Sequence, residues 1–277
     1  MKNLFLFVVL ILLSHTNFAQ NNSSKLPKKG TLSVTWGWNW SAYTPSDIHF
    51  KGEGHDFTIR DVKASDRPST FDMNTYVVHF TTPQYNFKLA YFLTDNWNFS
   101  FGVDHMKYVM NQNQYVTIDG TINTGGPYDG QYNNATIQLT NDFLTFEHTD
   151  GLNYIYLGAN RFDELFNFEK INFANIAINL TEGISGGMYY PKTNSKLLGN
   201  DRFDEFRVSG FGFDANIGLN ITFFNYFFIE GDLKGGYVNM PNIYTTPNPS
   251  DRADQTFFYT QYNFVLGANI PLGNKKL

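Results

Sequence analysis

Apolar and polar residues alternate one by one along much of this chain. Between residues 31 and 43, leucine, valine and three tryptophans alternate with serine, threonine, glycine and asparagine. Successive side chains of a β-strand point to opposite faces, so a period of two predicts strands with one apolar and one polar face. The pattern predicts eight strands, at about 31–43, 84–93, 97–104, 151–161, 171–189, 211–220, 227–237 and 261–270.

Long and short connections alternate between the predicted strands. The long connections are residues 44–83, 110–150, 191–204 and 241–254. The short ones are residues 94–96, 163–169 and 224–225. This alternation is typical of outer-membrane barrels, which have long outer loops and short periplasmic turns. We therefore predict an all-β fold, an eight-stranded antiparallel transmembrane β-barrel that occupies residues 20–277.

The polar face of the predicted strands carries mainly small residues, with a few charges of both signs. Charged residues make up 16% of the chain and aromatic residues 18%, whereas soluble domains carry about 25% charged residues. A narrow eight-stranded interior is filled by small side chains and paired charges, so the aromatic face is expected to meet lipid. The alternative is a soluble barrel with its apolar set inside.

Residues 1–19 have the layout of a secretory signal peptide. Lys2 is followed by an apolar run from Leu4 to Leu13 and by the small residue Ala19. The run is too short to span a bilayer as a helix. We therefore expect Sec-type export, cleavage of the signal peptide and localisation in the cell outer membrane.

With these features the chain resembles the small eight-stranded outer-membrane barrels of Gram-negative bacteria, and the segment Phe18-Ala19-Gln20 resembles signal-peptide ends of the Bacteroidota. The resemblance implies a monomer surrounded by outer-membrane lipid and lipopolysaccharide. It also implies a structural or surface-binding role through the extracellular loops, with an extracellular protein or glycan as partner. The net charge of −5 and the absence of a lysine and arginine cluster argue against nucleic acid.

The second long connection is predicted to hold a β-hairpin. Residues 112–122 and 136–146 both alternate, and residues 123–130 between them are rich in turn-forming residues. We expect the third and fourth strands to continue into this hairpin above the membrane. Such a protrusion is suited to contact with a partner, and shielding of the barrel mouth is the equal alternative.

Histidines provide the only candidate for catalysis. The five histidines beyond residue 19 all lie in the first half of residues 20–277, in predicted outer loops or at outward strand ends. Asp104 cannot orient His105, and Glu147 cannot orient His148, because neighbours on a strand point to opposite faces. His105 is expected on the lipid-facing set, and antiparallel pairing of the third and fourth strands could bring it near His148.

This arrangement resembles the outer-membrane lipid A deacylases, in which a histidine and a serine two residues apart on one strand face the lipid. Here Asp150 stands where the nucleophilic serine would be, two residues after His148. An outer-leaflet lipid acyl hydrolase would then use His105, His148 and Asp150 to activate water directly. This enzyme is one alternative to a non-enzymatic surface role.

A third alternative is a narrow pore for small solutes, lined by Arg207, Glu230, Asp232 and Lys234. Because an eight-stranded interior is just filled by side chains, these residues are predicted to form an interior ion-pair network instead. A metal site is not predicted, since the chain has no cysteine and the residues around His49, His55 and Asp56 match no metal-binding spacing. No cofactor is expected.

Overall fold

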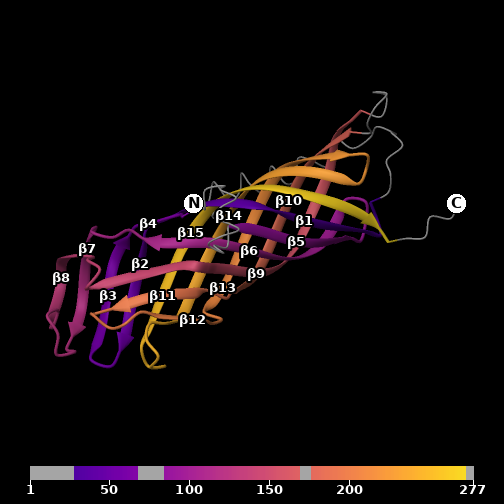
Figure 1. The fold of residues 1–277 in the computed structure, drawn as a ribbon. Helices are drawn as coiled ribbons and strands as arrows, with labels where there is room; N and C mark the ends of the chain where they lie inside the picture. The colour runs from indigo at the N-terminus through magenta and orange to yellow at the C-terminus, as the bar shows by residue number, and fades with distance from the viewer. Residues whose placement is uncertain (1–27, 68–83, 169–175, 273–277) are drawn as a thin grey trace, which may run out of the picture.

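A computed structural model describes residues 28–67, 84–168 and 176–272, so the predicted signal peptide lies outside the described residues. Within these ranges the secondary structure consists of fifteen strands joined in one continuous sheet (Figure 1). The described residues include no helix long and apolar enough to cross a membrane.

Eight of the strands close into a ring. Each strand pairs antiparallel with the next, and the first strand of the ring pairs with the last, from Thr31 opposite Pro271 to Tyr43 opposite Tyr259. The predicted eight-stranded antiparallel barrel is therefore confirmed. In ring order the strands are β1 (Thr31–Tyr43), β5 (Tyr85–Phe92), β6 (Trp97–Met110), β9 (Leu144–Asn167), β10 (Ile176–Tyr189), β13 (Gly210–Phe223), β14 (Phe227–Tyr244) and β15 (Arg252–Pro271).

The sequence pattern placed each of these strands but not all of their ends. The bounds of β1 agree with the prediction, whereas β9 and β15 start earlier and β9 also ends later. The predicted turn at 163–169 was wrong in its start, because Phe166 still pairs with Ile178 of β10. Alternation is weakest where a strand leaves the apolar region, since both faces there carry polar residues.

The two faces of the ring differ as the alternation predicts. In β1 the side chains of Thr35 and Asn39 are buried, whereas Trp36 is 43% exposed. Every strand of the ring exposes a large apolar side chain on its outer face, namely Trp36, Tyr91, Phe99, Leu157, Ile184, Phe213, Phe227 and Tyr262. We call this surface the apolar belt. A soluble barrel would bury such a set, whereas a continuous apolar belt is the outer surface of a membrane barrel.

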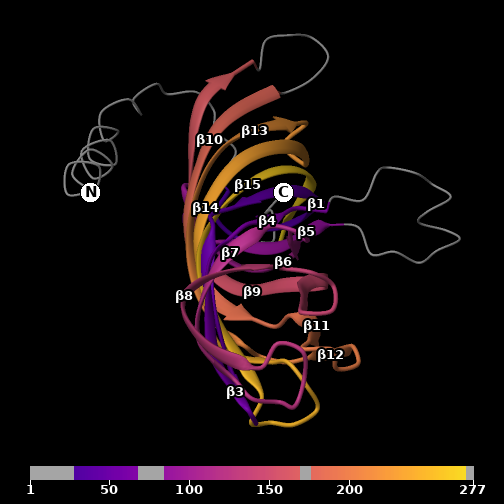
Figure 2. The same ribbon diagram turned by 90° about the vertical axis from the view of Figure 1, so that its left-hand side faces the viewer.

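One end of the barrel carries a second structural unit, which we call the outer lobe (Figures 1 and 2). The start of β15 pairs with β2, and the sheet continues through β3 and β7 to β8. β11 pairs with the start of β9 and with β12, and β4 pairs with the end of β6. The strands of the lobe are β2 (Ser46–Gly52), β3 (His55–Val62), β4 (Ala64–Ser65), β7 (Tyr115–Ile122), β8 (Gly130–Gln138), β11 (Lys192–Leu197) and β12 (Phe203–Phe206).

The outer lobe has an aromatic core. The Phe50 ring lies 5.2 Å from that of Phe57 and 5.6 Å from that of Phe146, and Phe57 is 5.9 Å from Phe143. These side chains are almost completely buried. Burying four phenylalanine side chains contributes on the order of 2 kcal/mol each, which makes the lobe a packed unit rather than a set of loops.

The predicted hairpin is present, but its predicted position was wrong. β7 and β8 pair with each other around the connection 123–129. The hairpin does not continue β6 and β9: β7 pairs with β3, with His55 opposite Ile122. The reason is the apolar stripe of β7, because Val116 and Ile118 become buried in the lobe core when β7 lies beside β3.

Candidate functional site

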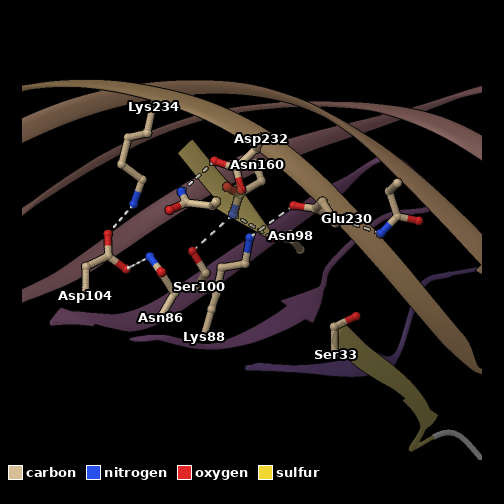
Figure 3. Close-up of polar contacts among 12 residues, drawn as sticks. Ser33, Asn86, Lys88, Asn98, Ser100, Asp104, Asn160, Glu230, Asp232 and Lys234 are labelled. Atoms are coloured by element: carbon tan, nitrogen blue, oxygen red, sulfur yellow. Dashed lines mark hydrogen bonds and ion pairs between the residues drawn. The ribbon is translucent and has the colours of Figure 1, made fainter. Parts of the chain in front are cut away.

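The barrel interior is filled by a polar network (Figure 3). Lys234 Nζ donates to Asp104 at 2.5 Å, and Asn86 donates to the other oxygen of Asp104 at 2.6 Å. Lys88 lies 3.7 Å from Glu230, which accepts a hydrogen bond from Asn220 at 2.9 Å. These contacts join charges of opposite sign from strands on different sides of the ring, so the predicted interior network is found.

The same network leaves little room for a solute. Among the described residues, the barrel interior holds a cavity of about 20 Å³ beside Lys88 and Lys234, enough for one water molecule. Arg207, predicted to belong to this network, lies instead in the outer lobe just after β12. An open channel would require the charged side chains to move apart, so the geometry gives the pore no support.

His105 lies on the outward face of β6, as the alternation predicts, but it is covered. Its ring stacks on Tyr85 at 5.2 Å between centroids, and its Nδ1 is 2.7 Å from the amide oxygen of Asn153. Only 4% of the residue is exposed. Its environment holds the imidazole rigidly and offers little access to a lipid ester.

His148 lies in the core of the outer lobe, with its ring 5.5 Å from that of Tyr108. A β-bulge between Met106 and Tyr108 shifts the register so that Tyr108 pairs with His148. The Nδ1 atom of His148 is 2.9 Å from the Thr193 hydroxyl. Burial lowers the pKa of His148 to about 4, so the ring is neutral at pH 7.

The Asp150 side chain forms ion pairs with two basic residues. Its carboxylate is 3.4 Å from Lys192 and 3.1 Å from Arg202, both in the segment that contains β11 and β12. The structure therefore places His105 on the outward face, His148 in the lobe core and Asp150 in a surface ion-pair cluster. His105 lies beside Gly151, the neighbour of Asp150 in the sequence, but the three side chains have separate polar partners, and the lipid hydrolase stays a prediction that this geometry does not favour.

A different histidine joins the outer lobe to the barrel. Both ring nitrogens of His49 meet carboxylates, Nε2 with Asp56 at 2.8 Å and Nδ1 with Asp254 at 2.9 Å. Burial lowers the pKa of His49, but the hydrogen bonds to the two carboxylates outweigh it and raise the pKa above its usual value. In its protonated form the ring donates from both nitrogens and links β2 to β3 and β15.

Sequence reasoning singled out the segment around His49 but missed this role. Asp254 is 205 residues away, and only the pairing of β2 with β15 brings it close. No local signal identifies such a partner. Within the described ranges, no group of three or more histidine, aspartate or glutamate side chains is placed to hold a metal ion.

Among residues 28–67, 84–168 and 176–272, the outer sheet ends at β8, which pairs with β7 on one side only. The strand has the sequence GQYNNATIQ, without a charged residue or proline. Three of its side chains, Tyr132, Ala135 and Ile137, pack on the lobe core but are only partly buried. β8 therefore lies at the edge of the sheet (Figure 1), and its apolar side chains, which cover the lobe core, stay partly exposed.

Comparisons with known proteins return small membrane barrels among solved structures. No protein-family model and no curated sequence matches this chain. The attachment invasion locus protein Ail of Yersinia pestis is 9% identical, with a TM-score of 0.30, over 87% of this chain and 99% of that one. OprG of Pseudomonas aeruginosa is 10% identical, with a TM-score of 0.37, over 87% and 96% of the two chains. Neisserial surface protein A is 9% identical, with a TM-score of 0.31, over 88% and 97%.

At such low identities and TM-scores, the fold assignment rests on the strand ring itself. Pairing of β1 with β15 closes eight antiparallel strands, polar side chains fill the interior, and large apolar side chains form the belt outside. These three features occur together in barrels that cross a membrane. The described residues form an eight-stranded antiparallel β-barrel with the architecture of outer-membrane barrels.

Proposed function

We propose that this protein resides in the cell outer membrane and binds an extracellular polypeptide through the free edge of β8. The observation that carries the proposal is the open edge of the outer sheet, nine residues long, at the far end of the lobe from the barrel. An exposed edge strand presents unpaired backbone N–H and C=O groups that another strand can complete.

The composition of β8 supports this role. Edge strands that avoid pairing usually carry proline, lysine or another charged residue. From Gly130 to Gln138 the strand has none of these. One local feature limits the contact: a bulge between Ile118 and Gly120, with Asn134 donating its N–H to Asp119. We expect the partner to pair with the straight parts of β8 on either side.

The lobe core supports the same partner chemistry. Tyr132, Ala135 and Ile137 pack on the core and stay partly exposed, so an added strand with apolar residues at every second position would extend the apolar layer. Its alternate residues would be polar and face water. The partner is thus an extended segment with an alternating pattern, held by backbone hydrogen bonds.

The test uses three lysines placed on the edge. The variant Gln131→Lys/Asn133→Lys/Thr136→Lys changes exposed or partly exposed positions of β8, and the control Thr58→Lys/Thr117→Lys/Thr121→Lys places the same charge on β3 and β7. The probe is a fluorescent nonapeptide of alternating valine and threonine flanked by lysines. We expect the wild type and the control to bind it and the edge variant to bind about tenfold more weakly. Equal binding by all three proteins would exclude β8 as the site.

A further inference from the structure

Arg207 differs from most arginines of the described chain. Arg60, Arg67, Arg161 and Arg202 each form an ion pair with a carboxylate. The guanidinium of Arg207 instead lies over the ring of Tyr244, 3.6 Å from its centroid, and forms no ion pair among the described residues. Stacking covers one face of the guanidinium and leaves its N–H groups free, the arrangement in which arginine recognises phosphate.

A small cavity of about 40 Å³ adjoins this arginine. Glu205, two residues before Arg207, lines the same cavity, as does Ser209. The two charged side chains are exposed, and no ion pair joins them. The cavity therefore offers a cation and an anion side by side, each available to a group from outside.

The position of the cavity at the barrel rim indicates what that group is. Phe206 and Val208 on either side of Arg207 are each 50% exposed. Three residues further along, Phe211 is also exposed and begins the apolar belt on β13. Apolar surface thus continues from the belt to the charged pair, as it does where a lipid headgroup meets its acyl chains.

We propose that this cavity binds the phosphoethanolamine headgroup of an outer-leaflet lipid. The phosphate accepts hydrogen bonds from Arg207, the primary ammonium donates to Glu205, and the acyl chains lie along Val208 and Phe211. A purely anionic headgroup would leave Glu205 unmatched, and a quaternary ammonium could not donate to it. The inference rests on the membrane location in the proposed function but not on the edge of β8.

Native mass spectrometry of the full chain, released from vesicles, tests the site. Vesicles contain phosphatidylethanolamine, phosphatidylglycerol or phosphatidylcholine, and free phosphorylethanolamine is added in a separate arm. We expect the wild type to retain phosphatidylethanolamine preferentially, and the free headgroup alone to bind far more weakly because it lacks acyl chains. Arg207→Gln should lower retention about tenfold, the effect of losing a charge-assisted hydrogen-bonding group.

Three further variants separate the contributions. Arg207→Lys keeps the charge but not the planar guanidinium, so its retention of phosphatidylethanolamine should lie between those of the wild type and Arg207→Gln. Glu205→Gln should remove the preference for phosphatidylethanolamine over phosphatidylglycerol. Arg202→Gln makes the same charge change in an arginine that pairs with Asp150 and Asp204, and should leave retention unchanged.

Insertion of each protein is measured separately by its heat-dependent mobility on a gel. A wild type that inserts but retains the three lipids equally would overturn the headgroup site alone. Unchanged retention by inserted Arg207→Gln would do the same. A wild type that does not insert into any vesicle would overturn the membrane location and the site with it.

Discussion

At the scale of single residues, two histidines of the outer lobe respond to pH in opposite directions. His148 is neutral in the folded lobe because burial lowers its pKa from 6.5 to about 4. In the unfolded chain it takes up a proton below about pH 6.5, so acid favours unfolding. The lobe should lose stability as the pH falls from 6.5 to about 4, by about 3 kcal/mol.

Hydrogen exchange of β7 and β9 between pH 4 and pH 7 measures this loss, after correction for the intrinsic pH dependence of exchange. In His148→Phe the pH-dependent part should disappear, although the variant loses the hydrogen bond to Thr193 and is less stable at pH 7. A wild-type lobe whose corrected protection is the same at both ends of this range would contradict the neutral, buried state of the ring.

His49 has the opposite dependence because its pKa is raised in the folded state. Its stabilising contribution is fully present below about pH 6.5 and is lost as the pH rises through the folded-state pKa. The side chain is 34% exposed, so solvent reduces the effect to about 0.2–1 kcal/mol. Protection of β2 and β3 should therefore decrease from pH 6 to pH 9 in the wild type, and this part of the decrease should be absent in His49→Gln.

At the scale of elements, Gly120 controls how closely β7 approaches β3. Its φ is +121°, and a Cβ atom there would lie 2.2 Å from the Asp56 carbonyl oxygen. Gly120→Ala should weaken the outer sheet by about 1–2 kcal/mol for the backbone conformation and about 1–3 kcal/mol for overpacking. Protease cleavage of folded protein in the segment 123–130 should become faster.

Gly125 provides a matched control for this substitution. It also has a positive φ, +80°, but a Cβ atom there would have no neighbour within 4 Å. Gly125→Ala should therefore show only the cost of the backbone conformation. If the two variants are cleaved at the same rate, the close approach of β3 and β7 does not limit the stability of the sheet.

Whether an element could be predicted depends on how far apart in the sequence its paired strands lie. Strands of the belt were predictable because lipid and a narrow interior impose a strict contrast between alternate residues. β2 and β3 also alternate, with Ile48, Phe50, Phe57 and Ile59 buried, but they were included in a long loop because they are short and their polar face is charged. The place of β2 beside β15 depends on residues some 200 positions away, which no local pattern records.

The residues of the candidate site also differ in whether their positions could be predicted from the sequence. The outward face of His105 follows from alternation alone, whereas the β-bulge after Met106 that directs His148 into the core does not. The stacking of Arg207, just after β12, on Tyr244 at the end of β14 was likewise not predictable. We predicted Arg207 among the interior charges because the sequence shows that the residue is charged. It does not show whether the connection that holds Arg207 belongs to the barrel interior or to the outer lobe.

At the scale of the whole molecule, we expect the barrel to fold without the tip of the outer lobe. The ring closes through pairings among its own eight strands, and β7 and β8 pair with none of them. Replacing residues 115–138 with a short glycine-serine linker should therefore leave the barrel intact, while the uncovered lobe core lowers stability locally. Heat-dependent mobility after insertion into vesicles should be kept, and loss of that mobility would show that the hairpin is required for the barrel.

Closure of the ring by β1 and β15 also has a kinetic consequence. Thr31 pairs with Pro271, so the last seam of the barrel joins residues separated by nearly the whole described chain. Contacts so distant in sequence form late and slowly, because a long loop must be closed before they are gained. The barrel cannot be completed until β15 is available to pair with β1. Until then the aromatic strands on either side of the seam have unpaired edges, which favour aggregation.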